Sequence, residues 1–175
     1  MRGHAVALAL LGAALACAKH ARAYEHKNFR LLWEAPYDCM EADPFFIRKC
    51  DLKGGGESKQ LFSYEQTKWG MRIVSTSRSY TPGENCLGFK DCNSGGWFSN
   101  KEQCYFEIQE CDGRPEQDWS LTECGFKQYP VVEYRTYQIK NAAKDVCITK
   151  IKNEKYIRAV TCKGLDEYDQ QWMMN

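Results

Sequence analysis

An internal repeat constrains this chain more than any other feature of its sequence. Each of three segments has an early cysteine, a later cysteine, and then a glutamine followed two residues on by an aromatic side chain. The copies run from Cys147 to Trp172, from Cys86 to Trp119 and, more weakly, from Cys39 to Phe62. Because a repeat marks one structural unit used several times, it governs the choice of fold before any single motif does. The repeat predicts three related β units and argues against an enzyme built around one cleft.

The first residues follow the pattern of a secretory signal peptide. Arg2 gives a positive start, an apolar run extends from Val6 to Ala18, and small residues suited to cleavage end at Ala23. The apolar run is too short for a bilayer, which needs about 20 residues. We therefore predict a signal peptide over residues 1–23, a single domain over residues 24–175, no membrane span, and a secreted, extracellular protein.

The charge balance of the chain argues against one class of partner. The sequence has 24 basic and 23 acidic residues. Residues 1–23 contain three of the basic residues and no acidic one, so 21 basic and 23 acidic residues remain after processing. Since phosphate backbones are bound by basic surfaces, we predict that the protein does not bind nucleic acid.

Nine cysteines remain after residue 23, and in an exported chain cysteines indicate disulfides first. Three pairs follow from the repeat, and a fourth brackets an insert rich in Gly, Asn and Ser: Cys39–Cys50, Cys86–Cys111, Cys147–Cys162 and Cys92–Cys104. Cys124 is left over. It leaves open a free thiol, a disulfide-linked partner, or an error in one of the four pairs.

Short apolar and aromatic runs between frequent turns predict an all-β chain. Several runs alternate apolar and polar residues, as half-buried strands do, for example Met71–Ser75 and Tyr156–Val160. No long amphipathic helix follows the signal peptide. The aromatic residue that ends each repeat is large enough to fill a shared core, so we predict that Phe62, Trp119 and Trp172 are buried structural residues.

The repeat resembles the ricin-type β-trefoil lectin family. The resemblance is carried by Val160–Gly164 leading to Asp169–Trp172, and by Cys111–Gly113 leading to Gln117–Trp119. The chain is also similar to the cysteine-rich domain of the mannose receptor group. The resemblance implies a β-trefoil of three disulfide-bearing lobes, at about 29–80, 81–130 and 131–175. It also implies a glycan or glycoprotein as the partner.

The sugar-binding positions of that family are only partly kept. In the family, a carboxylate two residues after the first cysteine binds sugar hydroxyls, and an aromatic two residues before the second cysteine stacks on the sugar. The first lobe offers Glu41 as the carboxylate, Arg48 at the stacking position and Phe46 as a displaced ring. The other two lobes have no carboxylate and no aromatic at these positions: Gly88, Gln109, Thr149 and Val160.

Two hypotheses of function follow. The first is a secreted lectin-like protein with a non-standard carbohydrate site at Glu41, Phe46 and Arg48, extended by Trp97 and Phe98 of the stapled insert. The second is a trefoil that has lost sugar binding and docks a protein receptor through its loops, as a toxin-like, immune or host-interaction factor.

Catalysis finds little support in the sequence. Residues 24–175 contain one histidine, His26, which lies near the expected new N-terminus, a poor place for a preorganised base. No pair of the form C-x-x-C suits a cysteine-only zinc site, and no phosphate-binding or dinucleotide motif occurs. We therefore predict that the protein is not an enzyme and has no catalytic residues, no metal and no cofactor.

Overall fold

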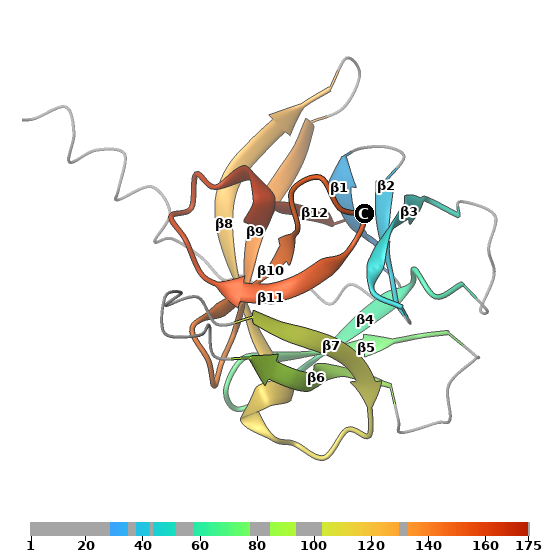
Figure 1. The fold of residues 1–175 in the computed structure, drawn as a ribbon, viewed down its shortest axis with the longest axis vertical. Coiled ribbons are helices and arrows are strands. Elements are labelled where there is room, and N and C mark those ends of the chain that lie inside the picture. The colour runs from blue at the N-terminus through green and yellow to red at the C-terminus, as the bar shows by residue number, and fades with distance from the viewer. Residues whose placement is uncertain are drawn as a thin grey trace, which may run out of the picture.

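The computed structural model describes residues 29–34, 38–42, 44–51, 58–77, 85–93, 103–129 and 133–174. These residues form β-strands and two short 3-10 helices, so the all-β expectation agrees with the structure (Figure 1). The elements are β1 (Leu31–Glu34), β2 (Asp38–Glu41), β3 (Phe46–Lys49), β4 (Phe62–Gln66), β5 (Met71–Ser75), β6 (Cys86–Asn93), β7 (Gln103–Gln109), η2 (Pro115–Gln117), β8 (Asp118–Gln128), β9 (Glu133–Asn141), β10 (Val146–Lys150), β11 (Ile157–Thr161), η3 (Tyr168–Gln170) and β12 (Trp172–Met174).

The strands form one antiparallel sheet that closes on itself. Seven strands follow one another in the order β10, β11, β7, β6, β5, β8 and β9, and β9 pairs with β10 to complete a barrel. Strands β12, β1, β2 and β3 continue from β9, and β4 lies beside β5. The long hairpin of β8 and β9 projects beyond the rest of the barrel at the top of Figure 1.

The expectation of a β-trefoil is contradicted by this architecture, which is a closed seven-strand barrel with extra strands, and by the solved structure that it resembles, described below. The physical reason lies in what a local repeat specifies. Each copy determines a hairpin within itself: β2–β3, β6–β7 or β10–β11. It does not determine how strands of different copies pair, and the pairings β7–β11 and β5–β8 join the units into one sheet.

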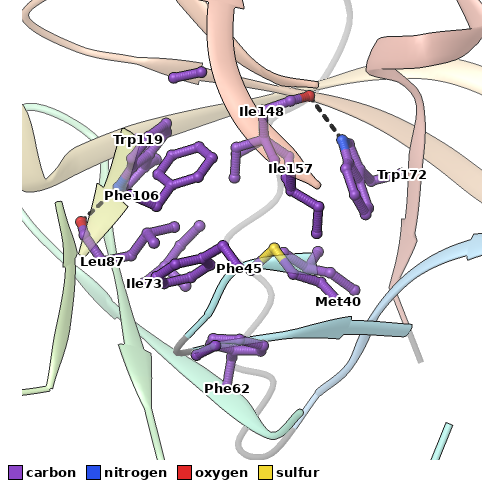
Figure 2. Packing of buried hydrophobic residues seen from close by; sticks show 14 of the residues in the cluster. Met40, Phe45, Phe62, Ile73, Leu87, Phe106, Trp119, Ile148, Ile157 and Trp172 are labelled. Atoms are coloured by element: carbon purple, nitrogen blue, oxygen red, sulfur yellow. Dashed lines mark hydrogen bonds between the residues drawn. The ribbon is translucent and has the colours of Figure 1, made fainter. Parts of the chain in front are cut away.

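The core of the barrel is built from side chains that alternate along the strands. β5 illustrates the pattern, because Met71, Ile73 and Ser75 are buried and the two residues between them are half-buried. Phe62, Trp119 and Trp172 are completely buried in the core. The two indoles hold their positions by hydrogen bonds as well as by packing, shown as dashed lines in Figure 2. Trp119 Nε1 donates to the Leu87 carbonyl at 3.2 Å, and Trp172 Nε1 donates to the Ile148 carbonyl at 2.8 Å.

The glutamine of each repeat holds the chain on both sides of the second cysteine. In the last copy, Gln170 Oε1 accepts from the Lys163 N–H at 2.9 Å, and its Nε2 donates to the Thr161 carbonyl at 3.1 Å. Gln117 and Gln60 make the same two kinds of hydrogen bond around Cys111 and Cys50. All three amides are buried. Buried amides need such partners, which explains why glutamine stands at this position.

Four disulfides brace the structure, and they are the pairs that the repeat suggests: Cys39–Cys50, Cys86–Cys111, Cys92–Cys104 and Cys147–Cys162. Cys124 is half-buried and belongs to none of these four pairs, and its Sγ donates to the Thr122 carbonyl at 3.3 Å. Four disulfides are consistent with a secreted protein, because cytosolic thiols are kept reduced.

Some expectations fall outside the described residues. These are the signal peptide at residues 1–23 and the lobe boundaries near residues 80 and 130. The described ranges contain no helix whose length and apolar character would let it cross a bilayer.

Candidate functional site

The residues expected to bind a sugar are engaged within the protein. Glu41 forms an ion pair with Arg48 at 3.5 Å, and it accepts a hydrogen bond from Gln60 Nε2 at 3.2 Å. The guanidinium of Arg48 lies 4.6 Å from the centre of the Phe46 ring and covers it. Glu41, Phe46 and Arg48 are therefore brought together on the β2–β3 hairpin, as the sequence suggested, but they contact one another. Trp97 and Phe98 lie outside the described residues.

The equivalent positions in the other two repeats are also closed to a ligand. Thr149 is buried, and its hydroxyl donates to the Cys147 carbonyl at 2.8 Å. Val160 is buried in β11. Gly88 packs so closely under Gln109 that an added Cβ would meet the amide of that side chain. Packing thus occupies the positions at which a sugar would bind.

A different site opens on the barrel beside β7. It is a cleft of about 670 Å³, within the range of small-ligand sites. Its lining residues are Pro44, Phe45, Lys90, Tyr105, Phe106, Glu107, Ile108, Tyr156 and Arg158.

The cleft exists because β7 and β11 pair over a short distance only. Only two residue pairs are in register between them: Ala159 with Cys104, and Val160 with Gln103. Beyond that point the segment before β3 packs against β11 instead, since the Ile157 N–H donates to the Phe45 carbonyl at 3.1 Å. The exposed part of β7 therefore faces a gap between strands of the second and third repeats.

A β-bulge places Lys90 at this cleft. In the β6–β7 ladder, Phe89 pairs with Phe106 and Asp91 pairs with Tyr105, so Lys90 is an extra residue in β6. A bulge redirects a side chain relative to a regular strand, and bulges are frequent beside functional sites. Lys90 is exposed and forms no ion pair within the described part of the chain.

Arg158 is the second cation of the cleft, and its neighbours hold it in one place. Its Nη1 donates to Gln103 Oε1 at 3.1 Å, and its guanidinium lies 4.8 Å from the centre of the Tyr105 ring. The carboxylate of Glu154 lies 3.8 Å from Nη2, a long and weak ion pair. The side chain is about one quarter exposed, at 23%. Arg158 is therefore preorganised by its neighbours while part of its side chain stays exposed.

Aromatic side chains form the walls and the floor. Tyr105 and Tyr156 are large exposed rings at the rim, at 41% and 54% exposure. Phe45 and Phe106 lie below them, both buried, with ring centres 5.3 Å apart; both are labelled in Figure 2. Glu107 is half-buried at the edge of the same cleft. Two cations, one carboxylate and an apolar floor together suit a ligand that joins a negative group to an apolar body.

Sequence reasoning missed this site because its residues come from different repeats. The cleft combines β6, β7, the segment before β3 and the β10–β11 hairpin, and no local motif predicts their meeting. One signal was present: Lys90 and Asp91 are adjacent polar residues that interrupt the alternation of β6, as a bulge does. Within the described residues, no group of histidine, cysteine and acidic side chains is arranged to hold a metal ion.

Comparisons with known proteins point to a fold and not to a family. No family model matches the sequence, and no curated protein matches it. Among solved structures, the chain is similar to a chain in the crystal structure of the lysenin pore, with a TM-score of 0.56 and 11% sequence identity. The similarity covers 86% of this chain and 45% of the lysenin chain, so this chain spans less than half the length of its structural neighbour.

The interpretation as a carbohydrate-binding lectin of ricin type is contradicted. The fold resembles that of a lysenin pore and not that of a ricin-type lectin. The expected sugar-binding positions are also not available to a ligand. Glu41 is bound by Arg48 and Gln60, and Thr149 and Val160 are buried.

Proposed function

We propose that this protein is secreted to the extracellular space and attaches to a membrane surface through the cleft between β7 and β11. Attachment is non-catalytic in this proposal. The main support is that two cations lie together above an apolar floor. Lys90 is placed there by a bulge, and Arg158 is held by Gln103 and Tyr105. Such a cleft can bind a charged head group and the apolar group next to it.

The structural neighbour supports the choice of a membrane. A pore acts in a membrane, and the similarity covers 86% of this chain. The similarity covers only 45% of the lysenin chain. We therefore propose that this protein acts at a membrane, and we do not propose that it forms a pore. Exposed aromatic side chains at the cleft rim, Tyr105 and Tyr156, fit a membrane interface, where amphipathic rings are favoured.

The absence of catalysis is part of the same proposal. The lining of the described cleft includes one carboxylate, Glu107, and no histidine, cysteine or serine. Acid–base and nucleophilic catalysis need a reactive side chain held by a positioned partner, and no ion pair between described residues positions the Glu107 carboxylate or the Lys90 ammonium.

Vesicle co-sedimentation tests the proposal. The protein from residue 24 onward is mixed with vesicles of phosphatidylcholine, phosphatidylethanolamine, phosphatidylserine and cholesterol, and the bound fraction is measured. We expect the native protein to sediment with the vesicles. We expect the double variant Tyr105→Ala/Tyr156→Ala to lose at least about tenfold in affinity, since interfacial aromatic residues carry much of such binding.

Trp69→Ala is the matched control. Trp69 is also an exposed aromatic, at 61%, but it lies in the turn between β4 and β5 and does not line the cleft. This variant should bind as the native protein does. If Trp69→Ala abolished binding while the double tyrosine variant bound normally, attachment would belong to another surface and the proposal would be wrong.

A further inference from the structure

We propose, building on the proposed function, that the cleft recognises a phosphodiester head group with a single negative charge, and that Glu107 sets this limit on charge. Three charged side chains line the cleft: Lys90, Arg158 and Glu107. The formal sum of these three is one positive charge, which matches one negative charge on a ligand; Glu154, which pairs weakly with Arg158, is outside the lining.

Arg158 supplies the directional part of the recognition. A guanidinium has five N–H donors in a plane, and it binds phosphate oxygens in pairs. Among the described residues, Arg158 gives one hydrogen bond, to Gln103 Oε1, and its other contact is the long pair with Glu154. The Tyr105 ring, whose centre is 4.8 Å from the guanidinium carbon, supports the side chain from one side. Donors therefore remain for a ligand in an orientation that is already set, so little conformational entropy is lost on binding.

Lys90 supplies the second positive charge. Its ammonium is on a flexible stem at the bulge of β6, opposite the β7 residues Tyr105 and Phe106. A lysine binds phosphate as a point charge without a fixed geometry. It can therefore follow a head group that Arg158 has already positioned.

Glu107 makes the cleft selective. It lies in β7 and its side chain lines the same cleft, half-buried, without an ion pair inside the described ranges. A carboxylate repels a second negative charge on a ligand, and this repulsion is stronger in a partly desolvated site. A phosphodiester carries one negative charge, whereas a phosphate monoester approaches two near neutral pH. The cleft should therefore bind a phosphodiester more tightly than a phosphate monoester.

The aromatic rim accounts for the rest of the ligand. Tyr105 and Tyr156 flank the cations, and Phe45 and Phe106 form an apolar floor. The part of a phospholipid next to its phosphate is the glycerol and the start of the acyl chains, which fits against such a surface. The same phosphodiester also exists in soluble form, so the experiment must separate the two sources.

Binding is measured by co-sedimentation with three kinds of vesicle, each diluted in phosphatidylcholine: phosphatidylglycerol, phosphatidic acid, and phosphatidylcholine alone. The native protein is expected to bind phosphatidylglycerol vesicles roughly tenfold more tightly than either of the others. Lys90→Ala and Arg158→Lys should each remove most of that preference, since a hydrogen bond to a charged group contributes about a tenfold or larger effect. The binding should also weaken as salt concentration rises.

Glu107→Gln is the decisive variant, because it predicts a gain. Removing the carboxylate at nearly constant size should raise affinity for phosphatidic acid vesicles about tenfold and leave phosphatidylglycerol binding equal or tighter. A residue with only a structural role would not improve binding of one head group. Glu110→Gln serves as the control, since Glu110 is an exposed acid just after β7 that does not line the cleft.

The outcomes separate this inference from the proposed function. Equal binding to all three vesicles, lost in Tyr105→Ala/Tyr156→Ala, would overturn the charge rule and keep the cleft as the attachment site. No binding to any vesicle would overturn both. The soluble head group glycerophosphoglycerol is added as a competitor. If it displaces the protein at the concentration at which vesicle lipid saturates binding, the phosphodiester rule holds and its source is a soluble ligand. Weak competition assigns the source to the membrane.

Discussion

Single residues of this protein are fixed by what they contact in the core. Gln170 is an example, since its buried amide has four partners: Lys163, Thr161, Gln138 and Thr149. An apolar residue in its place would remove all four hydrogen bonds, and only a second bond each would remain to Thr149 and Gln138, with the Cys147 and Lys163 carbonyls.

We expect Gln170→Ala to lower the free energy of unfolding by about 2–4 kcal/mol, because each buried polar group left without a partner costs about 1–3 kcal/mol. Denaturant titration measures the change. Gln128→Ala is the control, since Gln128 is exposed at the end of β8 and should change stability by less than about 0.5 kcal/mol. Equal effects of the two substitutions would show that the buried amide is not a structural clamp.

Two glycines offer a second test at the same scale. Gly70 and Gly125 both have a positive φ, at +154° and +137°, where side chains are rarely found. A Cβ on Gly70 would clash with the Trp119 carbonyl oxygen, whereas a Cβ on Gly125 would meet nothing within 4 Å. We expect Gly70→Ala to cost roughly 3 kcal/mol and Gly125→Ala about 1 kcal/mol. Thermal unfolding of both variants checks the order, and a reversed order would refute the explanation by close packing.

Among the strands and hairpins, the repeat predicted buried aromatic residues and disulfide pairs even though the fold inferred from it was wrong. The buried aromatics Phe62, Trp119 and Trp172 and the four disulfides correspond to positions marked in the sequence. Each is local to one repeat, and local patterns determine hairpins. The pairing of β7 with β11 joins two repeats, and the sequence of neither strand indicates which strand it pairs with. For that reason the barrel and its cleft could not be predicted, while the hairpins could.

The same difference between contacts within one hairpin and contacts between repeats applies to the binding residues. Glu41, Phe46 and Arg48 share one hairpin, so the sequence could place them together. It could not show that they neutralise one another. Arg158 and Tyr105 are far apart in the sequence and meet only because β11 lies beside β7.

The β10–β11 hairpin allows a prediction about the contribution of its disulfide to stability. It carries Tyr156 at its turn, and Cys147–Cys162 closes it over a separation of 15 residues. We expect Cys147→Ala/Cys162→Ala to lower the free energy of unfolding by about 3 kcal/mol, because the cross-link limits the unfolded chain. Denaturant titration without reductant measures this. An unchanged unfolding midpoint would mean that the barrel holds the hairpin without its disulfide.

At the scale of the whole molecule, the cysteines predict a covalent state. Eight form disulfides within the chain, and Cys124 lies half-buried on β8. We expect the protein from residue 24 onward to show one thiol per chain when titrated in denaturant, and to migrate as a monomer on a non-reducing gel. A dimer that reductant dissolves, with no titratable thiol, would instead show that Cys124 joins two chains.

If the barrel attaches to a membrane through the cleft between β7 and β11, bound lipid should cover the strands around that cleft. Hydrogen–deuterium exchange with and without phosphatidylglycerol vesicles tests it most directly, because it reports which backbone segments the bound surface covers. We expect slower exchange in residues 103–109 and 151–158, with little change in the β8–β9 hairpin. Protection confined to that hairpin, or no protection in either segment while the protein is bound, would contradict it.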